Sequence, residues 1–286
     1  MQLKKLYLLL SFIPLLILYQ CTYQSDKTTL SSDGIEISFN VQGKGKPAIF
    51  FVHGWTNNKT IWDDQVKYFS EKYKVVTIDL AGHGKSEDKR ENWTMSAFGD
   101  DVVAVINKLR LKEVVLVGFS MGGPVIVESA KKIPEIVEGL IFVDTMQDID
   151  LKYSSEMIDN HINYMMDFVT NPSEEKSAGF LFKRNNEESF KRASRMLENA
   201  SQVGWEKSLR GLYHWYNEES VASIKEINPP IIAINSDLRP TNIKAIRKYI
   251  PSFDAKIINN TGHVVFWDGP DEFNQILGEA IKEFSE

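Results

Sequence analysis

The residues with the clearest chemical potential form the pentapeptide Gly-Phe-Ser-Met-Gly at residues 118–122. A short apolar run, residues 114–117, precedes it, and an amphipathic run follows it. A serine at a sharp turn between a strand and a helix is held clear of the backbone, and small residues on either side prevent clashes in that strained turn. The pattern therefore predicts that Ser120 is a nucleophile at the N-terminus of a helix.

Ser120 needs help from other groups, because a serine hydroxyl is a poor nucleophile at neutral pH. A base must lie within hydrogen-bonding distance of the hydroxyl, and a third group must fix the tautomer of that base. The function of Ser120 therefore depends on the elements that bring such groups to it.

Short apolar runs of the kind found in buried parallel strands recur along the chain. They lie at residues 48–52, 75–78, 114–117, 140–143, 231–234 and 255–258, and an alternating run at 35–41 indicates a half-exposed strand. Amphipathic stretches separate them at residues 63–70, 95–109, 124–132, 241–249 and 272–283. This alternation predicts an α/β fold in which helices cover both faces of a sheet.

One segment of about 85 residues interrupts the alternation, and a structureless loop of that length would be unusual in a compact domain. It contains helical patterns at 155–169 and 187–199. We therefore expect an inserted helical cap at 146–228, between two parts of the core at 33–145 and 229–286. The cap is rich in methionine and aromatic residues, and we expect some of them to line an apolar substrate pocket.

Several motifs occur in the order typical of one superfamily. They are His53-Gly54-Trp55, the run Asp-Leu-Ala-Gly-His-Gly-Lys-Ser at 79–86, the pentapeptide with its following glycine at 118–123, and Gly262-His263. In these motifs residues 33–286 resemble the α/β-hydrolase superfamily. The resemblance implies a mostly parallel sheet with an inserted helical cap, and acyl transfer to Ser120. A serine at this position excludes the members that use a nucleophilic aspartate, namely the epoxide hydrolases and haloalkane dehalogenases.

The sequence has five histidines. By position and chain order, the resemblance implies that His263 is the base. His53 belongs to the motif of the oxyanion loop, which we expect it to support, and we expect a structural role for His83 in its glycine-flanked turn. His161 and His214 lie in the cap, where we expect surface or pocket-wall positions.

Two aspartates compete for the role of the acid. Asp237 follows the apolar run 231–234, where most of the family carries the acid, although the usual glycine is missing there. Asp144 ends the preceding strand, a position that some members use. Both carboxylates would project from the same edge of the sheet. We favour Asp237 and keep Asp144 as the alternative, while Asp79 matches a turn residue of the family and is expected to be structural.

The resemblance also implies which groups stabilise the developing oxyanion. They are the backbone N–H groups of Trp55 and Met121. We expect no cofactor and no metal, since the sequence has no His/Cys cluster at ligand spacing and the serine mechanism needs none.

The N-terminus has the pattern of an export signal. Lys4 and Lys5 precede an apolar stretch at 6–19 that contains a proline. A membrane-spanning helix needs roughly 20 apolar residues, so residues 1–20 indicate a signal peptide rather than a permanent span.

The only cysteine, Cys21, follows this stretch, where a bacterial lipoprotein carries its lipidated residue. The preceding Leu-Tyr-Gln is larger than the residues usual there, and a signal that is cut elsewhere is the alternative. We expect lipidation of Cys21, a polar tether at 21–32, and an exported protein that is anchored to the membrane and faces the periplasm or the cell exterior.

Charge and composition exclude other classes. The chain of 286 residues has 33 Lys and Arg against 39 Asp and Glu, a net charge of -6. This balance gives no cationic surface for nucleic acid. A single cysteine also forbids an intrachain disulfide.

The sequence thus predicts a serine hydrolase that cleaves an ester or related acyl bond of a small, largely apolar substrate. Similar motifs occur in C–C bond hydrolases, lactonases, thioesterases and perhydrolases, and the fold does not choose among them. The alternative from another class is a hydrolase-like protein that binds a ligand without catalysis.

Overall fold

The computed structural model describes residues 26–173, 175, 180–184, 186–198 and 201–285. The predicted signal peptide and Cys21 therefore lie outside the described residues. No helix in the described part of the chain is both long and apolar enough to cross a membrane.

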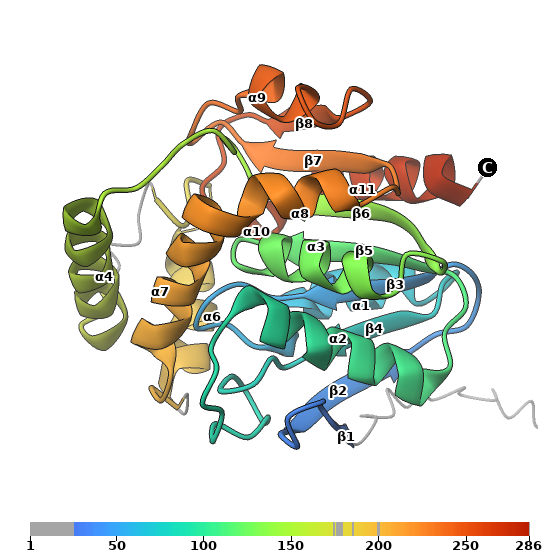
Figure 1. The fold of residues 1–286 in the computed structure, drawn as a ribbon, viewed down its shortest axis with the longest axis horizontal. Coiled ribbons are helices and arrows are strands. Elements are labelled where there is room, and N and C mark those ends of the chain that lie inside the picture. Colours follow the sequence, from blue (N-terminus) through green and yellow to red (C-terminus); the bar gives the residue numbers. More distant parts are fainter. Residues whose placement is uncertain (1–25, 174, 176–179, 185, 199–200, 286) are drawn as a thin grey trace, which may run out of the picture.

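The described residues form one eight-stranded sheet in the order β1-β2-β4-β3-β5-β6-β7-β8 (Figure 1). Pairing is antiparallel between β1 and β2 and between β2 and β4, and parallel across the rest of the sheet. The mostly parallel α/β fold is thereby confirmed. The strands are β1 (Lys27–Leu30), β2 (Glu36–Gln42), β3 (Ala48–Val52), β4 (Val75–Ile78), β5 (Val114–Phe119), β6 (Val137–Val143), β7 (Ile231–Ser236) and β8 (Asp254–Ile258).

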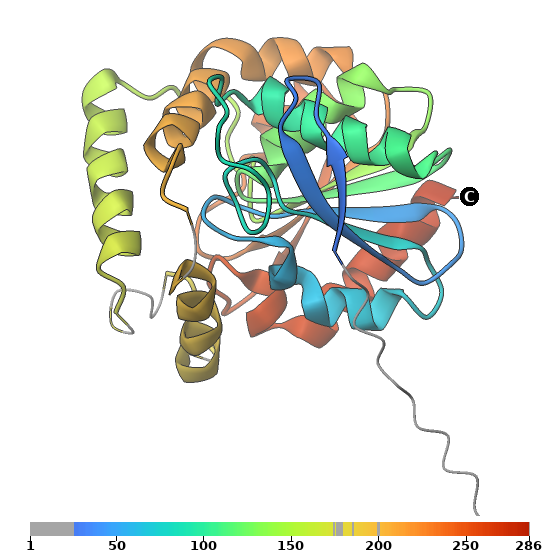
Figure 2. The ribbon, with the colours of Figure 1, turned by 90° about the horizontal axis from the view of Figure 1, so that it is seen from below.

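Helices cover both faces of the sheet. Figure 2 shows α2 and α3 (green) on one face, and α1 (light blue) and α11 (red) on the other. Each layer packs a separate apolar cluster, one containing Val102, Val125 and Ile224, the other Phe69 and Leu277. The core helices are η1 (Lys59–Trp62), α1 (Asp63–Phe69), α2 (Met95–Leu109), α3 (Gly122–Lys132), α9 (Ile243–Arg247), α10 (Val265–Asp268) and α11 (Pro270–Ser285).

The central strands are buried on both faces, which explains their continuous apolar runs. Every residue of β3, β4 and β5 is buried. The helix ends also follow local signals. The side chain of Thr94 accepts a hydrogen bond from the Ala97 N–H, so that α2 begins at Met95, and Arg110 ends it in the left-handed conformation with φ of 52°.

A helical insertion lies between β6 and β7, as predicted. It comprises α4 (Ser155–Thr170), α6 (Asn186–Glu198), α7 (Trp205–His214), the π-helix η2 (Trp215–Glu219) and α8 (Ser220–Glu226). In both views α4 lies farthest from the sheet, whereas α8 contributes Ile224 to the core (Figures 1 and 2). The helical patterns at 155–169 and 187–199 correspond to α4 and α6.

The predicted tether at 21–32 needs a correction, because residues 27–30 form strand β1 and pair with β2. This strand lies at the edge of the sheet, and Leu30 is 64% exposed. An edge strand with so little buried surface lacks the apolar pattern by which strands are recognised in a sequence.

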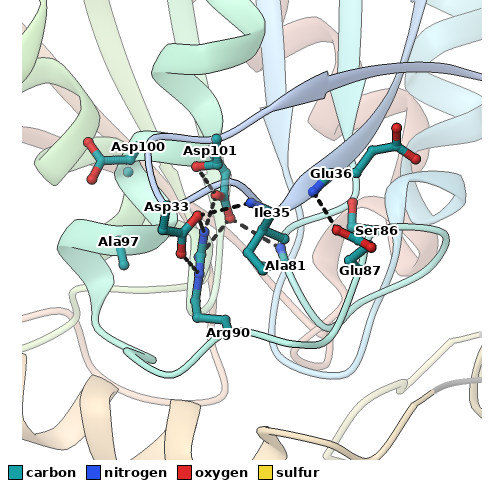
Figure 3. A network of polar contacts seen from close by, with 12 residues as sticks. Asp33, Ile35, Glu36, Ala81, Ser86, Glu87, Arg90, Ala97, Asp100 and Asp101 are labelled. Carbon is teal, nitrogen blue, oxygen red and sulfur yellow. Dashed lines mark hydrogen bonds and ion pairs between the residues drawn. The ribbon is translucent and has the colours of Figure 1, made fainter.

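A buried ionic network connects the hairpin of β1 and β2, at the edge of the sheet, to the rest of the molecule (Figure 3). The Arg90 guanidinium binds both oxygens of Asp101, at 2.9 and 2.5 Å, and reaches Asp33 beyond β1 through Nε at 2.8 Å. The side chains of Arg90 and Asp101 are 0% exposed. Ser31 also donates to Asp101 at 2.6 Å. The network therefore joins the β1–β2 turn, the loop that carries Arg90, and helix α2.

Candidate active site

Ser120 lies at the sharp turn between β5 and α3, with a positive φ of 51°. A Cβ atom on Gly118 would lie 2.3 Å from the Gly122 carbonyl oxygen, and one on Gly122 would lie 2.7 Å from the Val52 carbonyl oxygen. Both positions therefore require glycine, because the backbone approaches itself too closely for a side chain. The turn has the geometry that the pentapeptide predicts for a nucleophile.

A series of hydrogen bonds joins Ser120 to a histidine and an aspartate. The Ser120 hydroxyl lies 3.0 Å from His263 Nε2, and His263 Nδ1 lies 2.5 Å from Asp144 Oδ2. The other carboxylate oxygen of Asp144 accepts from the backbone N–H and the hydroxyl of Ser236, both at 2.8 Å. Asp144 is 3% exposed, so its carboxylate is held in one place at the ends of β6 and β7.

The structure corrects the preference for Asp237 as the partner of His263. Asp237 follows β7 and accepts from Lys183 Nζ at 2.9 Å and from the Thr261 N–H at 3.3 Å. The hydrogen bond from Lys183 lowers the pKa of Asp237 to about 2. It is Asp144, the alternative, that contacts His263. The physical reason is the length of β7. This strand continues to Ser236, which forms hydrogen bonds with Asp144. Asp237 therefore lies beyond the end of the strand, where it forms an ion pair.

The other histidines have the surroundings expected of them. His53 donates through Nδ1 to the Gly54 carbonyl at 2.7 Å and accepts through Nε2 from the Leu80 N–H at 3.0 Å, so it braces two loops. His83 is buried beside the Ala81 carbonyl. Burial lowers the pKa of His53 to about 4 and that of His83 to about 3. Both side chains are therefore neutral at physiological pH.

The cap histidines differ from each other. His161 lines the cavity beside Ser120 and bonds with the hydroxyl of Tyr213, whereas His214 is exposed near Glu219. Asp79 is structural, as expected, because its carboxylate accepts from the backbone N–H groups of Lys59 and Lys85. Among the residues that the structure describes, no group of three or more His, Cys, Asp or Glu side chains could hold a metal ion.

The two backbone segments predicted to hold an oxyanion lie beside Ser120. Met121 directly follows it, and a Cβ atom on Gly54 would lie 3.1 Å from the Ser120 Cβ. Trp55 and Met121 both line the same cavity as Ser120. Within the described parts of the chain, neither of their backbone N–H groups has a protein acceptor.

The cavity above Ser120 has a volume of about 200 Å³. Cap and core residues line it together, as expected of a substrate pocket under a cap. Its lining includes apolar side chains, among them Met165, Phe168, Val169, Phe180, Leu209 and Leu212. It also includes polar side chains, namely Thr145, Gln147, Tyr153, His161, Tyr216 and Arg239. Met146, Trp205 and Trp215 instead pack in the core, each 1% exposed.

Asp268 is a residue that sequence reasoning missed. It is 3% exposed and accepts from the backbone N–H groups of Gly262 at 2.7 Å, Lys183 at 2.6 Å and Arg184 at 3.2 Å. The His263 N–H also donates to the Phe180 carbonyl at 2.7 Å. The loop that carries His263 is thus bound to the cap segment Phe180–Arg184. No periodic pattern marks Asp268, since two of its three backbone partners, Lys183 and Arg184, are 85 and 84 residues away in the sequence.

Comparisons with known proteins agree with this fold. A sequence model of the α/β hydrolase fold family matches residues 47–270. The chain is 26% identical over 245 residues to an esterase/lipase-like protein of Haemophilus influenzae, covering 83% of each chain. A Mycobacterium tuberculosis protein is 32% identical over 110 residues, which is 38% of this chain and only 32% of that protein's length.

The fold is also shared with solved structures. The structure of a thermophilic esterase from Thermogutta terrifontis matches with a TM-score of 0.78 at 23% identity, over 91% of this chain and 99% of that chain. This structural similarity shows the shared fold. The match to the family model covers most of the sequence. The sheet order, the turn at Ser120 and the family match together show that the chain belongs to the α/β hydrolase fold family.

Proposed function

We propose that the protein is a serine hydrolase that cleaves an ester, or a related acyl bond, of a small and largely apolar substrate. The observation that carries the proposal is the hydrogen-bond series from Asp144 through His263 to Ser120. Each member has the neighbour that its role requires, because the hydroxyl faces one ring nitrogen of His263 and the other ring nitrogen faces a buried carboxylate.

In this mechanism the Ser120 oxygen attacks the acyl carbon while His263 Nε2 takes the hydroxyl proton. The acyl-enzyme forms when the bond to the leaving alcohol breaks and His263 returns the proton to that alcohol. Water, activated by the same nitrogen, then releases the acid and restores Ser120. Asp144 keeps the Nδ1 proton in place and stabilises the imidazolium. The backbone N–H groups of Trp55 and Met121 would hold the oxyanion.

The cavity supports an acyl substrate of limited size. Its volume is about 200 Å³, and methionine, leucine and phenylalanine side chains form part of its wall. Such a wall removes an apolar acyl or alcohol chain from water. The esterase/lipase-like relative from Haemophilus influenzae supports the same class of reaction.

The test uses 4-nitrophenyl esters of increasing acyl length together with a fluorophosphonate probe. We expect the wild type to hydrolyse short esters and to be labelled, and Ser120→Ala to lose both properties. The matched control is Ser129→Ala, since Ser129 is buried on α3, the helix that follows Ser120, and its hydroxyl bonds to the Val125 carbonyl. A Ser120→Ala enzyme with native activity would refute the proposal.

We also propose that the protein is exported and anchored to the membrane by a lipid on Cys21. The support is the sequence pattern of residues 1–21. In a bacterial host, labelling with an alkyne fatty acid should mark the wild type, and Cys21→Ala should move the protein from the membrane fraction to the soluble fraction. An unlabelled wild type would contradict this proposal.

A further inference from the structure

The cavity beside Ser120 is lined by both apolar and polar side chains, and one of the polar side chains is a cation. Arg239 follows β7 in the chain and lines the cavity together with Tyr153, Tyr216 and Gln147. Its side chain is exposed, and it forms no hydrogen bond or ion pair with any part of the chain that the structure describes. A substrate group could therefore reach its guanidinium.

The carboxylates in the chain segments next to Arg239 and Tyr153 have other partners. Asp237 pairs with Lys183 at 2.9 Å, and Asp150 pairs with Lys248. Asp148 accepts from Asn242 Nδ2 at 3.0 Å and from the Asp150 N–H, also at 3.0 Å. Among the described residues that line the cavity, Asp144 is the only acid, and its carboxylate is used by His263 and Ser236. Within the described part of the chain, no carboxylate therefore forms an ion pair with Arg239.

The charge of Arg239 acts on groups around the cavity. Burial raises the pKa of Tyr153 and raises that of Tyr216 to about 12, while the charge of Arg239 opposes both shifts. Burial, and then Arg239, lowers the pKa of His161. At neutral pH the two phenols therefore keep their protons, and they are neutral hydrogen-bond donors next to a cation.

The two phenols are held in place by the irregular part of the cap. Tyr216 lies in the π-helix η2, and Lys152 Nζ donates to the carbonyls of Tyr216 at 2.9 Å and of Asn217 at 2.5 Å. The Asn217 amide bonds with both the N–H and the carbonyl of Tyr153, at 2.9 and 2.8 Å. π-Helical turns often occur at functional sites. Here the turn presents Tyr216 beside the segment that carries Tyr153, so their positions are largely preorganised.

We propose that the substrate carries a carboxylate, which Arg239 binds with help from the hydroxyls of Tyr153 and Tyr216. The planar guanidinium suits a carboxylate, because it can donate two parallel hydrogen bonds. The acyl bond then lies at Ser120, and the apolar side chains of the lining contact the rest of the substrate. The inference rests on the proposed hydrolase function and narrows its substrate class. The carboxylate can belong to the acyl part or to the leaving group of the ester.

The experiment compares charged and neutral esters of similar shape. One pair places the carboxylate on the acyl part, as mono-4-nitrophenyl glutarate against 4-nitrophenyl pentanoate. The second pair places it on the leaving group, as 4-carboxyphenyl butyrate against 4-methylphenyl butyrate. The measured quantity is the ratio of kcat/KM within each pair, which cancels differences in the amount of active enzyme.

Arg239→Gln is compared with the wild type and with Lys244→Gln, which removes the same charge from α9 at an exposed residue outside the cavity. In the pair that matches the natural position of the carboxylate, we expect the wild type to favour the anion. We expect Arg239→Gln to lower that ratio by about 10-fold or more, mainly through KM, as for the loss of a charged hydrogen bond. Arg239→Lys should restore part of the ratio, and Lys244→Gln should leave it within about 2-fold.

The inference would be wrong if the wild type showed no preference for the anion in either pair. It would also be wrong if Arg239→Gln and Lys244→Gln changed the ratio equally, because the effect would then be a general one of net charge. In both cases the proposed hydrolase function would still stand if the wild type hydrolysed the neutral esters and Ser120→Ala did not. If none of the esters were hydrolysed and the fluorophosphonate did not label Ser120, both the proposed hydrolase function and the proposed carboxylate binding by Arg239 would be wrong.

Discussion

Two aspartates one strand apart illustrate how strongly a side chain depends on its immediate partners. Asp144 and Asp237 follow β6 and β7, which are parallel neighbours in the sheet. Asp144 is buried and bonds with His263 and Ser236, whereas Asp237 has a side chain that is 36% exposed and pairs with Lys183. Only the first arrangement can orient a histidine whose other nitrogen faces Ser120.

The contrast between these aspartates can be tested by matched amide substitutions. Asp144→Asn should lower kcat by roughly 10³- to 10⁴-fold, since an amide in this place favours the wrong tautomer of His263. Asp237→Asn should lower kcat by less than about 10-fold. Both are measured by 4-nitrophenyl ester hydrolysis, with circular dichroism as the check on folding. A larger loss in Asp237→Asn would restore the original assignment of the acid.

The two buried histidines should make the folded state sensitive to acid. Their pKa values are lowered by burial to about 4 for His53 and about 3 for His83, from 6.5 in the unfolded chain. Below pH 6.5 the unfolded chain therefore binds protons that the folded chain does not bind. The free energy of unfolding must then fall as the pH falls, by about 1–2 kcal/mol per histidine between pH 7 and pH 5.

Urea denaturation at pH 7 and pH 5 measures this effect above the range where most carboxylates titrate. In His83→Asn the loss of stability between the two pH values should be smaller by about 1–2 kcal/mol than in the wild type. His214→Asn is the control, because it removes a histidine that is exposed on the cap, and it should not reduce the loss of stability as His83→Asn does. If His83→Asn lost as much stability between pH 7 and pH 5 as the wild type does, protonation of His83 in the unfolded chain would not be a cause of the pH dependence.

At the scale of elements, the loop that carries His263 is bound to the cap. Asp268 lies at the end of α10 and binds backbone N–H groups from both the loop before His263 and the cap segment Phe180–Arg184. Asp237 adds an ion pair to Lys183 of the same segment. The position of His263 therefore depends on how the cap segment is seated.

Replacing Asp268 should weaken both stability and turnover. Asp268→Asn replaces an acceptor oxygen by an NH₂ group that faces backbone donors, so we expect a loss of about 1–3 kcal/mol in the free energy of unfolding. We also expect a lower kcat at a pH where the protein is folded, since His263 is then less well positioned. Glu279→Gln, an exposed change on α11 with the same loss of charge, should alter neither quantity measurably. Equal behaviour of the two variants would show that Asp268 does not position the loop.

At the scale of the whole molecule, the ionic network around Arg90 ties the sheet edge to helix α2. Arg90 and Asp101 are both fully buried, and Asp33 and Ser31 join them from the β1–β2 hairpin. Burial raises the pKa of Asp101 while Arg90 opposes that shift, so the carboxylate depends on its partner to remain charged. A buried charge without a partner is expensive.

Removing one partner should therefore cost far more than breaking an exposed pair. Arg90→Ala should lower the free energy of unfolding by about 3–5 kcal/mol, because Asp101 is left buried and unpaired. Lys46→Ala breaks the exposed pair between Lys46 and Glu113 and should cost about 0–1 kcal/mol. Urea denaturation curves at neutral pH measure both values. Similar losses in the two variants would mean that burial does not set the strength of the network.

The sequence by itself determined the features that depend on local pattern. The apolar runs, the helical insertion and the turn at Ser120 could all be predicted, because strand burial, helix periodicity and the glycine requirement of a tight turn act within a few residues. His263 followed from its motif and chain order. Strand β1 was missed, since an exposed edge strand buries too little apolar surface to mark its sequence.

Only the tertiary structure decided which groups meet. Asp144 and His263 are 119 residues apart, and Ser120 and His263 are 143 residues apart, so no local signal could choose Asp144 over Asp237. Local sequence could likewise not predict the contacts of Asp268 with the cap segment or the position of Arg239 at the cavity wall. These choices depend on strand length, loop path and cap position, which arise from packing between distant segments rather than from the residues next to each side chain.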